Sequence, residues 1–159
     1  MVFAQPAILN PGEVMATVRD ILAVKGTQVW SIDRQRSVLE AAVFMKEHKI
    51  GGIVVMEAGR CAGMFTERDV LQRVVAEQRD PARTTVGEVM TGEVVCCTPE
   101  SSIEEARSAM RDRRIRHLPV IDAEGVMRGL ISIGDLNAHQ LAHQESTIHM
   151  LHEYLYGRV

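Results

Sequence analysis

The sequence predicts an α+β protein made of two copies of one β-α-β-β-α unit. Residues 37–55 (SVLEAAVFMKEHKIGGIVV) align with residues 102–120 (SIEEARSAMRDRRIRHLPV) at an offset of 65 (102 − 37). The stretch GMFTERDVL, which begins at Gly63, is matched by GLISIGDLN, which begins 66 residues later at Gly129. A fixed offset of this kind is typical of an internal structural repeat, so the two halves are expected to share one fold.

An amphipathic helix that opens on a capping box is expected in each copy. The hydroxyl and the carboxylate of the box stand three residues apart, and apolar residues then recur at the helical period. The two pairs are Ser37 with Glu40 and Ser102 with Glu105.

Short β-rich runs are expected on both sides of this helix. One run precedes the helix and two follow it, and a glycine between the last two indicates a turn, at Gly59 or Gly125. The runs are 27–32, 53–56 and 63–65 in the first copy and 93–97, 118–121 and 129–131 in the second. A second helix then closes each copy.

The chain is expected to divide into five parts. They are an irregular segment (1–16), the first repeat (17–76), a polar linker (77–84), the second repeat (85–140) and a helical tail (141–159). The tail places Leu141, Ile148, Leu151 and Leu155 partly on one helical face, which favours a homodimer.

The composition is that of an ordinary globular protein, with 46% hydrophobic and 25% charged residues. No apolar run approaches the roughly 20 residues of a membrane helix, and the first residues lack the basic region of a secretory signal. The three cysteines form no C-x-x-C pair, which suits a reducing compartment. We therefore expect a cytoplasmic protein with no membrane segment.

A hydroxyl and a carboxylate recur where the last β-rich run of each copy ends, as Thr66 with Asp69 and Ser132 with Asp135. This spacing is that of a capping box for the helix that follows. A carboxylate there can also accept both hydroxyls of a cis-diol such as ribose, and a helix N-terminus attracts anions. The two roles are compatible, and the residues alone leave both open.

Basic residues crowd positions 111–117 (RDRRIRH) of the second copy. Arg111, Arg113 and Arg114 are explained by the end of a helix, where cations interact well with the helix dipole and with water. Arg116 and His117 lie past that helix and directly before an apolar strand. They are therefore candidates for contact with a phosphate.

These motifs together resemble a known family. Two tandem copies that end in GMFTERD and GLISIGD, with RRIRHLPV in the second, resemble the cystathionine-β-synthase (CBS) domain pair, or Bateman module, over about 120 of the 159 residues. The resemblance is strongest to small stand-alone bacterial CBS-pair proteins of signal transduction. It implies two units packed sheet against sheet about a pseudo-twofold axis, and a homodimer.

The resemblance also implies a function without catalysis or a catalytic cofactor. Two clefts would bind adenosine compounds such as AMP, ADP, ATP, NAD or S-adenosylmethionine, and an effector protein would receive the signal. Ribose would be held by Thr66 with Asp69 and by Ser132 with Asp135. Phosphate candidates are Arg116 and His117, opposite the Thr66 and Asp69 ribose, with Lys25 and Arg68 in addition. Adenine candidates are Ile50, Gly51, Gly52, Thr98, Pro99, Ile115 and Pro119.

The two clefts are expected to differ. The first copy has Gly51 and Gly52 where the second has Arg116 and His117. The cleft of Thr66 and Asp69 is therefore expected to prefer a compact phosphorylated ligand such as AMP, and the other to admit a longer one such as NAD or ATP.

Three other functions compete with nucleotide binding. A metal site would use His139 with His143 and His149 with His152, which stand at helical spacings that can supply two ligands each. Nucleic-acid binding would use the arginines of 111–116, but a net charge of −3 and only 4% aromatic residues argue against it. Catalysis would need a nucleophile with a histidine and an acid, and the sequence indicates no such arrangement.

Overall fold

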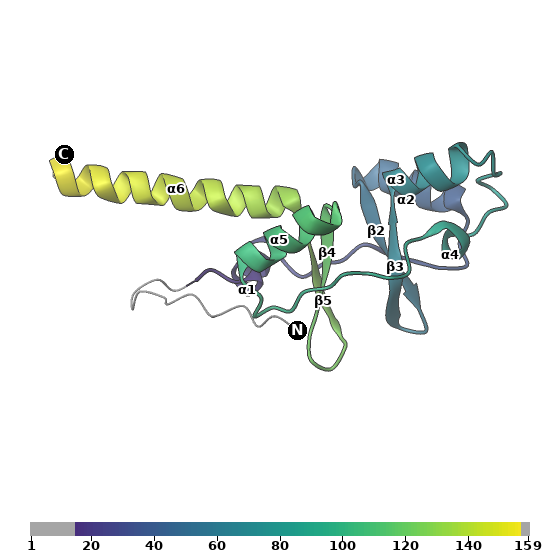
Figure 1. The fold of residues 1–159 in the computed structure, drawn as a ribbon, viewed down its shortest axis with the longest axis horizontal. Helices are drawn as coiled ribbons and strands as arrows, with labels where there is room; N and C mark the ends of the chain where they lie inside the picture. The colour runs from purple at the N-terminus through teal and green to yellow at the C-terminus, as the bar shows by residue number, and fades with distance from the viewer. Residues whose placement is uncertain (1–14, 157–159) are drawn as a thin grey trace.

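The structure is a computed structural model, and it describes residues 15–156, apart from the side chains of Glu153 and Tyr156. Almost all of the expected irregular segment 1–16 lies outside the described residues. Figure 1 shows two similar halves side by side, with one long helix that extends away from them.

The first half contains helices and strands in the expected order. Its elements are α1 (Val18–Lys25), β1 (Ser31–Asp33), α2 (Val38–His48), β2 (Gly52–Glu57), β3 (Arg60–Thr66), α3 (Glu67–Asp69) and the π-helix η1 (Val70–Val75). The second half repeats this order with fewer strands. Its elements are α4 (Val86–Val89), α5 (Ile103–Arg113), β4 (His117–Ile121), β5 (Met127–Ser132) and α6 (Ile133–Tyr156).

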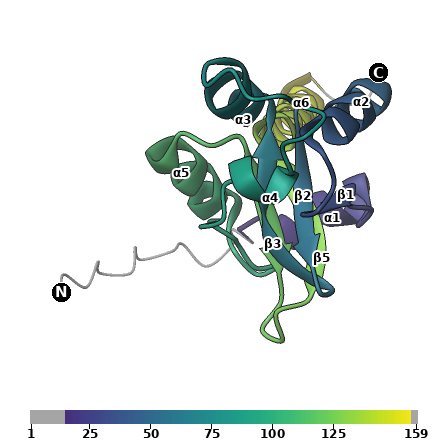
Figure 2. The same ribbon diagram turned by 90° about the vertical axis from the view of Figure 1, so that its right-hand side faces the viewer.

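Each half is built around one antiparallel hairpin. β2 pairs with β3 and β4 pairs with β5, and β1 adds a parallel strand to the first hairpin. The hairpins carry a register shift at equivalent places, between Val55 and Met56 and between Val120 and Ile121. Helices lie on both sides of the strands in Figure 2. The expected α+β repeat is confirmed.

The first β-rich run of each copy was predicted too long. Within 27–32 only Ser31 and Ile32 belong to a strand, β1, which continues to Asp33. The run 93–97 forms only a single parallel bridge, between Cys97 and Val120. These runs lie at the edge of each hairpin and pair with it only at their C-terminal ends. A β-like composition does not supply a neighbouring strand to pair with.

The first helix of each half packs against the other half. Val18, Ile21 and Leu22 of α1 belong to the core of the second half, whereas Val86 and Val89 of α4 belong to the core of the first. Backbone hydrogen bonds fix this exchange.

These backbone bonds join helix N-termini across the halves. Val18 N donates to Ser101 O at 2.9 Å, and Val86 N donates to Arg36 O at 2.8 Å. In the predicted linker, Thr84 O accepts from Val38 N at 2.9 Å, at the start of α2. The linker therefore caps a helix rather than serving as a loose spacer.

Candidate ligand-binding site

A cavity of about 270 Å³ lies between the two halves. It is lined from the first half by residues of β3, α3 and the loop before β2, and from the second half by the end of α5 and the segment after α4. The lining residues are Gly51, Met64, Thr66, Arg68, Asp69, Thr91, Glu93, Val94, Val95, Arg113, Arg114, Ile115, Arg116 and His117.

Thr66 and Asp69 stand at the junction of β3 and α3. Asp69 Oδ2 accepts hydrogen bonds from Thr66 N and Thr66 Oγ1, both at 2.8 Å, so the capping role is real. Asp69 Oδ1 accepts from Thr91 Oγ1 at 3.3 Å and lies 3.5 Å from Arg73 Nη1. An ionised carboxylate can accept about four hydrogen bonds, so Oδ1 keeps capacity for a ligand hydroxyl.

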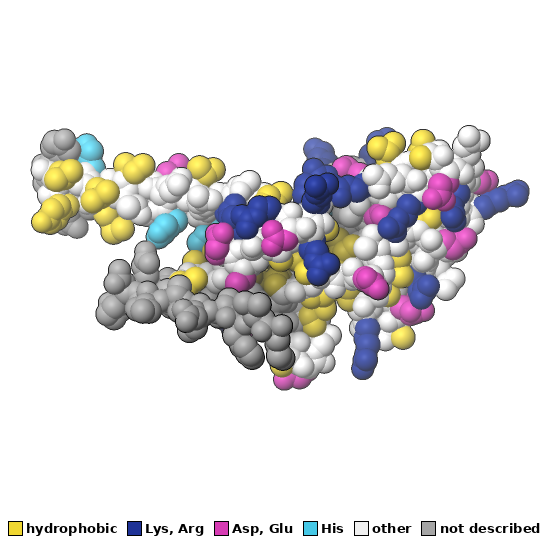
Figure 3. Space-filling view, viewed as in Figure 1, with side chains coloured by type: hydrophobic (Ala, Val, Ile, Leu, Met, Phe, Trp, Pro, Cys, Tyr) yellow, Lys and Arg dark blue, Asp and Glu magenta, His cyan; other side chains and the backbone are white. Residues whose placement is uncertain are grey.

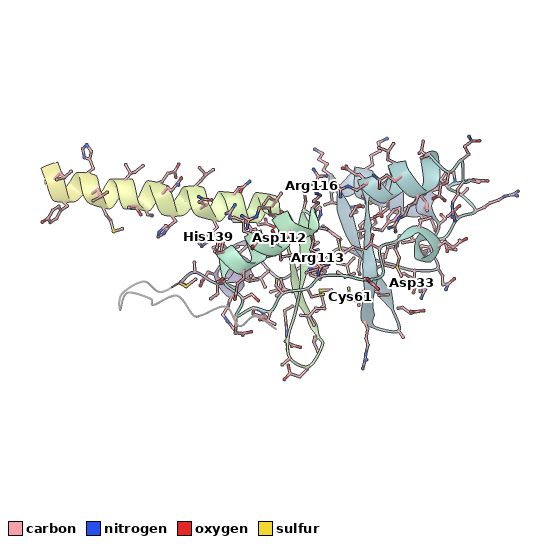
Figure 4. The ribbon with its side chains drawn as sticks, in the orientation of Figure 1. Asp33, Cys61, Asp112, Arg113, Arg116 and His139 are labelled. Carbon is pink, nitrogen blue, oxygen red and sulfur yellow. The ribbon has the colours of Figure 1, made fainter. Side chains whose placement is uncertain are left out.

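Four arginines, Arg68, Arg113, Arg114 and Arg116, line the same cavity. Arg68 Nη1 donates to Arg114 O at 3.0 Å, which joins α3 to the end of α5. Figure 4 labels Arg113 and Arg116 on the side of the second half that faces the first. Lys and Arg side chains gather over this junction in Figure 3. Guanidinium groups are the donors that phosphate oxygens favour.

His117 lies between the two halves. A Cβ added at Gly52 would lie 3.4 Å from His117 Cε1, so the glycine makes room for the imidazole. Burial lowers the pKa of His117, and the positive charges of Arg116 and Lys25 lower it further. The negative charges of Asp135 and Glu67 raise the pKa, but by less. The imidazole is therefore neutral at pH 7 and meets a ligand as a hydrogen-bonding group rather than as a cation.

The second carboxylate, Asp135, lies outside the lining of this cavity. Its Oδ2 accepts from Ser132 N at 2.7 Å and from Ser132 Oγ at 2.9 Å, as a capping box requires. Lys25 Nζ donates to the same oxygen at 2.6 Å. Burial raises the pKa of Asp135, but the hydrogen bonds from Lys25 and Ser132 outweigh it and hold the pKa below its usual value.

The predicted adenine residues fall in different places. Gly51 and Ile115 line the cavity, and Ile50 and Gly51 line a second depression beside Glu67. Pro99 instead holds the start of α1, since its backbone oxygen accepts from Arg19 N at 2.9 Å, and Thr98 N donates to Ser101 Oγ at 3.1 Å. Pro119 is buried in β4, where it pairs with Leu130.

Several lining residues were not among the sequence candidates. The sequence explains Arg113 and Arg114 by the helix end alone, and no motif indicates Met64, Thr91 or Glu93–Val95. Thr91 directly follows VGEVM, the stretch that extends the repeat at Val86. That alignment is the signal that could have indicated it.

The fold and the cavity define a class of protein, a tandem-repeat module with a polar cleft between its repeats. The family model of the CBS domain matches residues 18–76 and 86–141. The chain therefore belongs to the CBS-domain family, as a pair of CBS domains.

Known relatives agree with this assignment. The chain is 36% identical over 132 residues to the CBS domain-containing protein YhcV of Bacillus subtilis. The matched region covers 83% of this chain and 91% of the relative. A putative signal-transduction protein with CBS domains from Burkholderia ambifaria has a similar structure, with a TM-score of 0.77 and 37% identity over 81% of this chain and 96% of that one.

A more distant structure carries ligands. The CBS domain pair of protein MJ0100, in complex with 5′-methylthioadenosine and S-adenosyl-L-methionine, matches with a TM-score of 0.71 over 81% of this chain and 98% of that one. At 21% sequence identity, this structural similarity shows a shared fold and nothing further.

Within residues 15–156, no three His, Cys, Asp or Glu side chains come together in a way that could hold a metal ion. Nor does the described part of the chain contain a helix with the length and apolar character needed to cross a membrane.

Proposed function

We propose that this CBS pair is a regulatory module that binds an adenine nucleotide (AMP, ADP, ATP or NAD) in two unequal clefts and catalyses no reaction. Its occupancy would report the energy or redox state of the cell to an effector protein. The module would act as a homodimer in the cytoplasm.

One observation carries this proposal: a single cavity brings a diol acceptor and a set of phosphate donors together from opposite halves. Thr66 and Asp69 come from the first half, and Arg113, Arg114 and Arg116 come from the second. A ribose on Asp69 would direct a 5′-phosphate toward the arginines, and Gly51 and Ile115 would flank the base. A ligand with a diol at one end and negative charge at the other fits this polarity.

The other comparisons support the same ligand class. MJ0100, which shares the fold, holds two adenosine compounds. Burial raises the pKa of the Cys61, Cys96 and Cys97 thiols, that of Cys97 to about 11, so these cysteines are poor nucleophiles. A binding role without chemistry is consistent with both facts.

Titration calorimetry with AMP tests the proposal. Asp69→Ala is expected to weaken AMP binding at the cavity by about 1.5 to 3 kcal/mol, the range for hydrogen bonds to a charged group. Asp112→Ala removes the same charge from the exposed surface of α5 and should leave AMP binding unchanged. Equal affinities in wild type and Asp69→Ala would reduce Asp69 to its capping role.

A further inference from the structure

Most arginines of this protein are paired with carboxylates. Residues 15–156 contain fourteen arginines, and nine of them form ion pairs with described Asp or Glu side chains. The other five (14 − 9) form no ion pair with a described carboxylate; they are Arg60, Arg68, Arg113, Arg114 and Arg116. Of these five, Arg60 lies at the start of β3 and the other four line the cavity between the halves. The arginines without a carboxylate partner are therefore concentrated at one site.

The lining of this cavity carries an excess of positive charge. It contains the four guanidinium groups and two carboxylates, those of Asp69 and Glu93. Asp69 lies 3.5 Å from Nη1 of Arg73, which is outside the lining, so this pair is close to neutral. The remaining balance is about three positive charges (4 − 1). Because like charges repel, an anion that joins them is stabilising.

The same four side chains keep most of their hydrogen-bond donors. A guanidinium group has five N–H donors. Within residues 15–156, the structure describes one hydrogen bond from these four groups, which runs from Arg68 Nη1 to Arg114 O at 3.0 Å. This bond brings a guanidinium of the first half to the end of α5 in the second. The donors therefore span the junction, and they outnumber what the three acceptor oxygens of one terminal phosphate can use.

The depth of these groups gives a ligand its direction. Asp69 is buried, with 6% of its surface exposed, whereas all four arginines are exposed. A nucleotide whose ribose binds Asp69 would therefore point its phosphates outward, past the arginines and toward solvent. A phosphate monoester carries about 1.5 to 2 negative charges at pH 7, and each further phosphate adds about one. Two or three phosphates match the charge of the lining better than one does.

The arginines differ in how close they lie to the ribose position. A Cβ added at Gly52 would lie 3.3 Å from Thr66 Cγ2 and 3.4 Å from the His117 ring, so His117 lies beside Thr66. Arg116 directly precedes His117 and is placed for the first phosphate. Arg113 and Arg114 lie at the end of α5 and are placed for phosphates farther along a chain.

We propose that the cavity selects nucleoside diphosphates and triphosphates over monophosphates, and that Arg113 and Arg114 determine this specificity. The inference rests on the proposed function and narrows its ligand class. It differs from the compact ligand such as AMP that the sequence indicates for this cleft. The sequence assigns Arg113 and Arg114 to a helix end, whereas the fold brings both into the cavity lining.

Calorimetric titrations of the full chain with AMP, ADP and ATP test this selection. They are made at one ionic strength and without divalent cations, because screening weakens the interactions of exposed charges. ADP and ATP should each bind wild type at least about tenfold more tightly than AMP. The double variant Arg113→Gln with Arg114→Gln should lower the ratio of ADP to AMP affinity at least about tenfold and change AMP affinity less than about threefold. Arg60→Gln removes the fifth unpaired arginine, outside the cavity, and should leave the ratio unchanged.

Either of two results would overturn the inference. One is equal binding of AMP and ADP to wild type, and the other is a preference for ADP that survives in the double variant. Failure of the proposed function gives a different pattern, because wild type would then bind none of the three nucleotides. Melting temperatures establish folding, and Arg113→Gln alone serves the same comparison should the double variant not fold.

Discussion

His117 links the protonation of one side chain to the stability of the junction between the halves. Burial, Arg116 and Lys25 lower its pKa, so the folded protein protonates it below the unfolded value of about 6.5. Between these two pKa values the unfolded chain binds a proton that the folded chain does not. The contribution of His117 to the free energy of unfolding is therefore fully present above pH 6.5 and is lost as the pH falls below that value.

This link predicts a difference between wild type and His117→Gln. Urea unfolding at pH 7.5 and 5.5 should show that wild type loses more stability on acidification than the variant does. All other side chains are the same in both proteins, so the difference isolates His117. Equal losses in the two proteins would mean that the junction does not disfavour the imidazolium.

The same pKa sets the pH range in which His117 affects nucleotide binding. Between pH 8 and pH 7 the imidazole stays neutral, so AMP affinity, corrected for the phosphate's own protonation, should hardly change. Below pH 6.5 a bound phosphate favours the imidazolium, and AMP should bind more tightly to wild type than to His117→Gln. A steady tightening from pH 8 in both proteins would assign the effect to other groups.

At the scale of elements, alanine substitutions at three glycines should destabilise the fold to different degrees, depending on how closely other atoms pack against each glycine. Gly63→Ala would force a Cβ to within 2.6 Å of the Thr91 backbone carbonyl, whereas Gly129→Ala meets the tip of the Leu22 side chain, which can turn aside. Gly63→Ala should therefore cost about 1 to 3 kcal/mol of unfolding free energy, and Gly129→Ala less. Gly92→Ala, with nothing within 4 Å of the added Cβ, is the control. Urea unfolding ranks the three variants, and a Gly63→Ala protein as stable as the control would contradict the packing argument.

The elements also show which features local sequence can predict. The hairpins and the capping boxes at Ser37 and Ser102 were predictable because turn residues and i to i+3 pairs act within a few residues. The packing of α1 on the opposite half was not, because an apolar helical face does not indicate which sheet will cover it. The Lys25 contact with Asp135 depends on that packing and was missed for the same reason. Arg113 and Arg114 are exposed at the end of α5, as predicted, but their place in the lining of the cavity depends on the other half, which local sequence does not indicate.

At the scale of the whole molecule, α6 predicts how two copies associate. Leu141, Ile148 and Leu155 recur every seven residues, Leu151 follows three residues after Ile148, and all four are more than half exposed. Figure 1 shows this part of α6 extending beyond the two halves. A seven-residue apolar repeat favours a seam between two such helices.

Light scattering should therefore give twice 17.7 kDa at micromolar concentration. Ile148→Lys should shift the mass toward 17.7 kDa, because a charge in the seam opposes pairing. Ser146→Lys adds the same charge away from the seam and should leave the dimer intact. A dimer that survives Ile148→Lys would place the interface elsewhere.

Because α1 and α4 each pack against the other half, the order of translation determines when each half can complete its core. The first half cannot close until Val89 has left the ribosome, although its own strands end at Thr66. Leu22 waits longer, since its partner Gly129 is translated 107 residues later (129 − 22). At about 5 to 20 residues per second, that wait is roughly 5 to 20 seconds. During this interval Leu22 lacks the strand that it packs against, so chaperones have time to compete for α1 on the nascent chain.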